Sequence, residues 1–288
     1  MTTRSDPEPT IDRIFEVVAD TARDIRSILT DRRGALEGEN PSGETQLAAD
    51  VWADEHLVDR LGVLEGVGAV ASEERSTPTR TGDGFAVAID PLDGSSNLRS
   101  NNLMGTILGV YDASDLPAAG RDLVAAGYVL YGPTTTMVEA TVEGVRELII
   151  ESSCHRVVDA DVSIPADPTV YGFGGRVPEW SDPFRAFVRD IESELKLRYG
   201  GALVGDVNQV LAYGGIFSYP GLSSRPTGKL RLQFEGHPIG FIVEAAGGRS
   251  SDGTGSLLDR TPTDLHERTP VHVGSPSVID RLEDALDS

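Results

Sequence analysis

Apolar residues that recur at helical spacing predict helices along the chain. The first series begins after Thr10, a candidate N-cap, and runs toward Gly34, so we predict an amphipathic helix over residues 11–33. The apolar stripe of each helix is expected to pack in the core. The same spacing predicts further helices over 46–61, 183–195, 205–213, 237–246 and 276–286.

Short apolar and β-branched runs that end at Gly, Pro or Asp predict strands between these helices. In the second half they alternate with helices, which predicts a layered α/β (α+β) fold. The proline-containing segment 157–169 is the best place to divide the chain, so we predict two lobes, 1–167 and 168–288. The first lobe should hold an antiparallel sheet. The predicted strands are 67–72, 85–90, 105–111, 122–132, 134–141, 146–152, 169–174, 214–220 and 229–235.

The charge balance excludes two classes of partner. With 25 Lys and Arg against 46 Asp and Glu, the net charge is −21, which disfavours nucleic acid and anionic membranes. Lys196 and Lys229 are the only lysines, and such a composition resembles that of salt-accumulating halophiles; an acidic enzyme from a GC-rich genome is the alternative. No secretory signal or membrane-length apolar run is visible, and Cys154 is the only cysteine, so we expect a cytoplasmic protein.

The most informative residues follow the strand predicted at 85–90. There the sequence reads Asp-Pro-Leu-Asp-Gly-Ser-Ser-Asn over residues 90–97. The carboxylates of Asp90 and Asp93 and the Leu92 carbonyl suit Mg²⁺ or Mn²⁺, because these cations prefer several oxygen ligands. The small residues after them have amides that can turn toward an anion. A simple Asp-Gly turn is the alternative, and the full string argues against it.

Glu73 and Glu74 end a predicted strand, and successive side chains on a strand point to opposite sides. One could therefore bind a metal while the other takes part in the reaction. An isolated Glu-Glu pair is ordinarily a solvated turn, so this interpretation depends on the string at 90–97. Glu44 and Asp50, near a predicted helix start, would on their own be surface acids.

Long segments of the chain resemble class I fructose-1,6-bisphosphatases, which belong to a larger group of metal-dependent, lithium-sensitive sugar phosphatases. Inositol monophosphatases share Asp-Pro-x-Asp-Gly but usually continue with Thr, whereas Ser95 follows the fructose-bisphosphatase pattern. The resemblance implies a two-lobed α-β-α-β-α fold. It also implies hydrolysis of the 1-phosphate of fructose 1,6-bisphosphate to fructose 6-phosphate, in gluconeogenesis. The matching segments are 43–57, 71–74, 90–98, 105–111, 125–132, 198–220, 228–235 and 245–282.

The resemblance implies roles for individual acidic residues. Asp50 and Glu74 match the pair that positions and deprotonates the attacking water. Glu44 stands where the family usually has an Asp that serves a further metal. Two or three Mg²⁺ or Mn²⁺ ions per subunit are implied, and such ions lower the pKa of bound water. The other matched ligands are Glu73, Asp90, Asp93, Glu235 and the Leu92 carbonyl.

The resemblance also implies contacts with both phosphates of the sugar. Arg198 matches a residue that reaches a neighbouring subunit's site, which implies a homodimer or tetramer. From the residues alone, Lys229 lies two positions from an arginine in a strongly acidic chain, as a cationic phosphate pocket requires. Matches to the cradle of the cleaved phosphate are Gly94, Ser95 and Ser96. Matches near the distal phosphate are Tyr199, Tyr219, Lys229 and Arg231.

One departure from the family concerns the distal phosphate. Where the family commonly has Asn-Glu-Gly-Tyr, residues 171–179 read YGFGGRVPE, and Arg176 is the candidate replacement. A relocated arginine could accept another phosphate spacing, so a broader phosphatase acting on sedoheptulose 1,7-bisphosphate or inositol monophosphate stays open. A non-catalytic sugar-phosphate sensor is a further alternative, against which the complete set of matched carboxylates argues.

We expect no AMP inhibition of the kind found in animal enzymes of this family. Where those enzymes have a Lys-Tyr pair and an Arg for AMP, this chain has Gly84, Phe85 and Asp112. Titration of the phosphatase activity with AMP measures this directly. Strong inhibition at low AMP would contradict the expectation.

Overall fold

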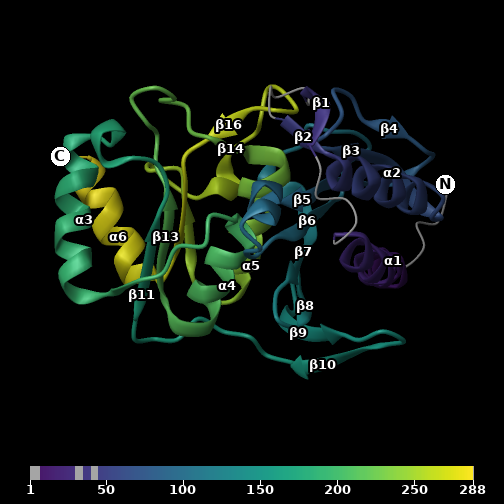
Figure 1. The fold of residues 1–288 in the computed structure, drawn as a ribbon, viewed down its shortest axis with the longest axis horizontal. Helices are drawn as coiled ribbons and strands as arrows, with labels where there is room; N and C mark the ends of the chain where they lie inside the picture. Colours follow the sequence, from purple (N-terminus) through teal and green to yellow (C-terminus); the bar gives the residue numbers. More distant parts are fainter. Residues whose placement is uncertain (1–6, 30–34, 40–44, 288) are drawn as a thin grey trace.

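The computed structural model describes residues 7–29, 35–39 and 45–287, and its layers follow the order α-β-α-β-α (Figure 1). Two helices cover one face of an eight-stranded sheet, two lie between that sheet and a five-stranded one, and two cover the outer face. The predicted layered fold is confirmed. In the order of these layers, the helices are α1 (Pro7–Ile28), α2 (Ala48–Gly62), α4 (Leu203–Tyr213), α5 (His237–Ala245), α3 (Asp182–Glu194) and α6 (Pro276–Leu286).

The eight-stranded sheet has the order β10-β9-β8-β7-β6-β5-β3-β4. Its neighbouring strands are antiparallel, as predicted, except for β3 and β5, which run parallel. This exception matters because it brings the ends of β3 and β5 to the same edge. The strands are β3 (Gly66–Ser72), β4 (Thr79–Arg80), β5 (Gly84–Asp93), β6 (Gly105–Tyr111), β7 (Leu123–Tyr131), β8 (Thr135–Thr141), β9 (Gly144–Ile150) and β10 (His155–Asp159).

The five-stranded sheet has the order β12-β11-β13-β17-β15 and mixes parallel with antiparallel pairs. Two short ladders, β1–β2 and β14–β16, complete the strands of the described residues. The bounds are β1 (Ala35–Glu39), β2 (Thr45–Leu47), β11 (Val170–Phe173), β12 (Lys196–Leu197), β13 (Gly215–Tyr219), β14 (Leu230–Arg231), β15 (Arg249–Ser251), β16 (Arg268–Thr269) and β17 (Val271–Gly274).

One predicted strand is wrong. Of residues 229–235, only Leu230–Arg231 are extended, and Leu232–Gly236 form a π-helical turn that leads into α5. The Leu232 amide donates to the Glu267 carbonyl, and the Glu235 carboxylate turns back to the Arg231 amide. The long-range bond to Glu267 and the local bond between Glu235 and Arg231 together override the apolar alternation of the segment. The first helix also ends earlier than predicted, at Ile28.

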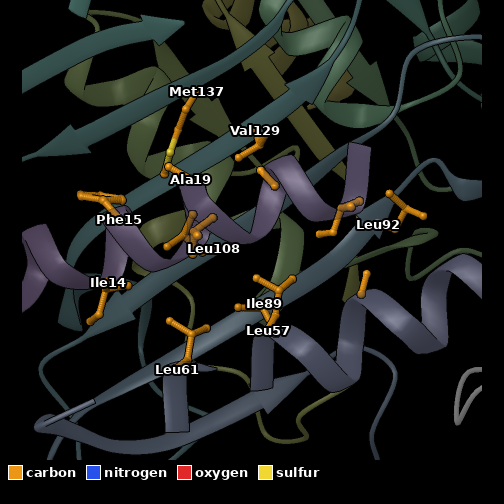
Figure 2. Packing of buried hydrophobic residues seen from close by; sticks show 14 of the residues in the cluster. Ile14, Phe15, Ala19, Leu57, Leu61, Ile89, Leu92, Leu108, Val129 and Met137 are labelled. Carbon is orange, nitrogen blue, oxygen red and sulfur yellow. The ribbon is translucent and has the colours of Figure 1, made fainter. Parts of the chain in front are cut away.

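The largest apolar cluster lies between α1, α2 and the eight-stranded sheet (Figure 2). Phe15 and Leu61, from the two helices, pack with Ile89 and Leu108 from neighbouring strands. Packing on both sides of this sheet fixes the strand ends that carry the acidic residues. Among the described residues, no helix has the length and apolar character needed to cross a membrane.

Candidate active site

Three buried carboxylates meet at one edge of the eight-stranded sheet. Oxygens of Glu73, Asp90 and Glu235 lie within 4.8 Å of one another. Glu73 follows β3 and its amide donates to the Ile89 carbonyl in β5 at 3.0 Å, which sets it beside Asp90. Glu235 comes from the π-helical turn Leu232–Gly236, a feature that is rare and often found at functional sites. Segments far apart in the sequence therefore build one cluster.

Arg231 lies against this cluster and is itself buried. Its Nη1 is 2.7 Å from Glu73 Oε1 and 3.8 Å from Glu235 Oε2. Its backbone amide donates to Glu235 Oε2 at 2.6 Å. The sequence associated Arg231 with the distal phosphate; the structure pairs it with the acidic cluster, and its contact with phosphate stays a prediction.

Burial dominates the electrostatics of the carboxylates. Loss of solvation raises the pKa of Glu73 to about 8, although the Arg231 guanidinium acts in the opposite direction. The same burial, with repulsion from neighbouring carboxylates, raises the pKa of Asp93 to about 7 and holds that of Asp90 well above its usual range. Such a cluster is stabilised by protons or by cations.

The donor set fits a hard divalent cation. Glu73 Oε2 is buried and has no amide, guanidinium or hydroxyl donor among the described residues. The side chains that converge here offer carboxylate oxygens, which Mg²⁺ and Mn²⁺ prefer. Asp90 and Leu92 are tied locally, because the Leu92 amide donates to Asp90 Oδ1 at 3.0 Å.

The loop after β5 joins the two halves of the chain. Asp93 Oδ2 accepts the Val204 amide at 2.8 Å, in the first turn of α4. Asn97 Nδ2 donates to the carbonyls of Leu103 and Gly200, each at 2.9 Å. Between them, Ser95–Arg99 form a short 3₁₀ helix that exposes Ser96. The predicted phosphate cradle is thus a tight turn that hydrogen bonds of Asp93 before it and of Asn97 after it hold in place.

Asp50 and Glu74 lie on neighbouring elements. Asp50, buried in the first turn of α2, accepts the Leu47 amide through Oδ2 at 2.7 Å. Glu74 is half-buried in the turn after β3, and its amide donates to Ser72 Oγ at 3.3 Å. Their catalytic roles stay predictions. Glu44, the predicted further metal ligand, lies outside the described residues.

Two of the residues predicted at the distal phosphate, Lys229 and Tyr219, lie close together, whereas two others are exposed. Lys229 Nζ lies 5.7 Å from the centroid of the Tyr219 ring, and both side chains are half-buried. Gly174, in the segment that departs from the family, packs against that ring so closely that a Cβ would lie 2.2 Å from Tyr219 Cδ2. Tyr199 and Arg176 are exposed.

Arg198 packs on its own chain in the structure. Its Nη1 donates to Gln209 Oε1 at 2.8 Å, and its guanidinium carbon lies 4.9 Å from the centroid of the Tyr213 ring. Both partners belong to α4. A reach toward a neighbouring subunit stays a prediction.

Sequence reasoning missed Asp206. This buried residue of α4 accepts the amides of Gly200 and Gly201, and burial raises its pKa to about 6. Asn97 donates to the carbonyl of the same Gly200, so Asp206 and Asn97 hold one loop from two sides. The pair of glycines followed at short distance by an Asp was the available signal.

Buried carboxylates at the ends of adjacent strands, beside a turn of small residues and between α/β layers, define the class of metal-dependent sugar phosphatases. The chain belongs to the fructose-1,6-bisphosphatase family. A family model for the N-terminal domain of fructose-1,6-bisphosphatase matches residues 10–159, and one for the C-terminal domain matches residues 164–287. The family is metal-dependent.

Curated relatives cover nearly the whole chain. A class 1 fructose-1,6-bisphosphatase of Halobacterium salinarum is 58% identical, over 96% of this chain and 97% of its own length. One of Natronomonas pharaonis is 60% identical, over 96% and 98%. These sources support the halophilic interpretation of the composition. The crystal structure of Leishmania major fructose-1,6-bisphosphatase in holo form has a TM-score of 0.92 at 28% identity, covering 99% of this chain and 97% of that one.

Gly94→Ala should disrupt the turn at Gly94, the predicted phosphate cradle. Gly94 has φ of 70°, and an added Cβ would lie 2.4 Å from the Ala202 Cβ. We expect a loss of about 2 kcal/mol or more in the free energy of unfolding and a raised KM. Gly247→Ala is the matched control, because Gly247 has φ of 82° and nothing within 4 Å of its added Cβ. Denaturant unfolding measures both, and equal losses would contradict the steric argument.

Removal of divalent cations should make stability fall as pH rises. The pKa of Glu73 is raised to about 8 and that of Asp93 to about 7, so the folded state holds protons that the unfolded state has released. Their contribution to stability is therefore full below the ordinary carboxyl pKa and is lost as pH rises through about 7 to 8. In chelator, the melting temperature should fall from pH 6.5 to pH 8.5, and Mn²⁺ should restore more of it at the higher pH.

His237 and His272 do not contribute to this change in melting temperature. Burial lowers the pKa of each to about 4, so both are neutral from pH 6.5 to pH 8.5. Asp93→Asn serves as the comparison, since it removes one of the carboxylates. A gain from Mn²⁺ that is the same at both pH values would show that the cluster does not bind the ion in competition with protons.

Proposed function

We propose that the chain hydrolyses the 1-phosphate of fructose 1,6-bisphosphate to fructose 6-phosphate and inorganic phosphate, as a cytoplasmic enzyme of gluconeogenesis. The observation that carries the proposal is the buried Glu73–Asp90–Glu235 cluster beside the turn at Gly94. The full-length similarity to class 1 fructose-1,6-bisphosphatases supports the choice of sugar.

The acidic cluster would hold Mg²⁺ or Mn²⁺, two or three ions per subunit. When bound, such ions lower the pKa of water and neutralise charge on the transferring phosphoryl group. The burial of the carboxylates supports this assignment, because a cation offsets their mutual repulsion. Glu44 would serve a further ion. The proposed ligands are Glu73, Asp90, Asp93, Glu235 and the Leu92 carbonyl.

The remaining groups orient the substrate and move a proton. Amides and hydroxyls of the turn at Gly94, Ser95 and Ser96 would bind the phosphate that is cleaved; these residues stand at the start of a short 3₁₀ helix, where small residues let backbone amides approach an anion. Asp50 and Glu74 would align the attacking water and accept its proton. As the water oxygen bonds to phosphorus, the bond from phosphorus to the C1 oxygen breaks, and the C1 oxygen takes up a proton from solvent to become the hydroxyl of fructose 6-phosphate.

The distal phosphate would be held by cationic and phenolic groups. The proximity of Lys229 to Tyr219 supports a pocket there, with Tyr199 and Arg231 as further contacts. Arg176 would replace the family's asparagine. Arg198 would face a neighbouring subunit in a homodimer or tetramer.

We assign the two lobes to residues 1–167 and 168–288, the first carrying most metal ligands and the second the distal phosphate contacts. The contribution of Glu235 to the acidic cluster supports a site that needs both lobes. Asn97 and Asp93 supply hydrogen bonds between them.

A broader sugar phosphatase is the second candidate, and one observation favours it. Gly174 packs directly on Tyr219, so the altered segment contacts the proposed distal pocket. A pocket rebuilt at this point could accept sedoheptulose 1,7-bisphosphate or inositol monophosphate.

Phosphate release from fructose 1,6-bisphosphate in high KCl, with and without Mg²⁺, tests the proposal. We expect metal-dependent release and a loss of about a hundredfold or more in Asp93→Asn, which keeps an acceptor for the Val204 amide but removes a carboxylate charge. Sedoheptulose 1,7-bisphosphate and inositol 1-phosphate are run beside it. Comparable rates on all three would favour the broader phosphatase, and no release with any metal would favour a non-catalytic sensor.

A further inference from the structure

An ion pair at the end of β3 joins the two elements that carry Asp50 and Glu74. We propose that Asp54 and Arg75 are positioning residues, whose pairing sets the place of Glu74 relative to Asp50 and thereby the rate of the chemical step. The inference rests on the proposed function. It concerns residues that neither touch the acidic cluster in the structure nor belong to the matched catalytic set.

The pair is close and largely buried. Arg75 Nε lies 2.9 Å from Asp54 Oδ2 and 3.2 Å from Oδ1, so one N–H is shared by both oxygens. The Asp54 side chain is 10% exposed and that of Arg75 31%. Arg75 Nη1 also lies 3.5 Å from Thr79 Oγ1 in β4. Charge-assisted bonds in such surroundings hold a defined geometry.

Helical spacing connects this pair to Asp50. Asp54 lies four residues after Asp50 in α2, and both are buried, so they share one face of the helix. Arg75 therefore contacts α2 one turn away from Asp50. The helix also covers β3, whose end leads directly into Glu73 and Glu74.

The backbone around Arg75 fixes the turn that holds Glu74. The Arg75 amide donates to the Ser72 carbonyl at 3.0 Å, and the Arg75 carbonyl lies 2.9 Å from His266 Nε2. The Glu74 amide donates to Ser72 Oγ at 3.3 Å. Glu74 thus lies in a short turn that hydrogen bonds to Ser72 hold in place. The guanidinium of the next residue, Arg75, connects that turn to Asp54 of α2.

His266 extends the connection to the other lobe. The next residue, Glu267, accepts the Leu232 amide at 2.8 Å, and Arg268 Nη1 donates to the Lys229 carbonyl at 2.6 Å. The Arg75 turn is therefore tied both to α2 and to the segment that carries Lys229. A role in position, more than in stability, suits such a junction, because a buried ion pair contributes little net stability over an apolar replacement.

The test compares Asp54→Asn, Arg75→Met, Arg75→Lys and the Asp54→Asn/Arg75→Met double variant. We expect kcat to fall about tenfold in Asp54→Asn and Arg75→Met, because small displacements of a proton acceptor carry large costs in rate. KM and the affinity for Mn²⁺, measured by calorimetry without substrate, should stay within about twofold. The double variant should be no slower than the single ones, because both act through one pair. Arg75→Lys should recover part of kcat.

A second ion pair on the same helix is the matched control. Arg60 Nη2 lies 2.7 Å from Asp24 Oδ2 and joins the last turn of α2 to α1, at the opposite end of the helix from Asp50. Arg60→Met should leave kcat unchanged. Melting temperatures of all variants separate a loss of folding from a loss of position, and Asp54→Asn preserves the side-chain shape if Arg75→Met folds poorly.

Glu74→Gln distinguishes the failure of this inference from failure of the proposed function. If the parent protein releases phosphate and Glu74→Gln does not, the proposed function holds. Wild-type kcat in Asp54→Asn and Arg75→Met would then overturn the positioning role alone. Equal loss of kcat in Arg60→Met, or a change in KM and Mn²⁺ affinity that matches the change in kcat, would also overturn it.

Discussion

The burial of several carboxylates at one sheet edge is the constraint on which the rest of the structure depends. Glu73 and Asp90 come from parallel neighbours, and Glu235 is brought to them from the second half of the chain. Burial raises the pKa of Glu73 and of Asp90, so keeping these carboxylates charged destabilises the fold unless cations or protons neutralise them. The helical layers on both faces of the sheet hold the strand ends against this repulsion. The positive charge of Arg231, which lies against the carboxylates, offsets part of their repulsion.

Local patterns predicted most of the fold because the information lies in nearby residues. The strand at 105–111 and the helix at 276–286 were predicted with the bounds that β6 and α6 have. The segment at 229–235 was not, because its π-helical turn depends on the Glu267 carbonyl and on the Arg231 amide. No periodicity of apolar residues encodes such partners. The parallel pairing of β3 with β5 was missed for the same reason, since it is a choice of neighbour.

The candidate site divides along a similar line. The string at 90–97 and the Glu73–Glu74 pair were identifiable because their chemistry is contiguous, and the structure places Glu73 and Asp90 together. The hydrogen bond from Asn97 to Gly200 could not be predicted, because the two residues lie about a hundred positions apart. Asp206 was missed although its partners are nearby, because two glycines followed by an Asp form only a weak signal. Arg231 shows the limit most clearly. Its match to a phosphate-binding position stays a prediction, and its ion pair with Glu73 could not be read from the sequence, because the two residues lie far apart along the chain.

Salt acts differently on the exterior of this protein and on its site. The net charge of −21 is carried largely by exposed acids, whose mutual repulsion is screened once the Debye length falls to about 3 Å near 1 M salt. The Glu73–Arg231 pair is buried at 2.7 Å, and buried pairs are screened far less. High salt can therefore relieve the surface without weakening the electrostatics of the site. An acidic surface adapted to salt and a site built to hold cations are compatible because burial separates them.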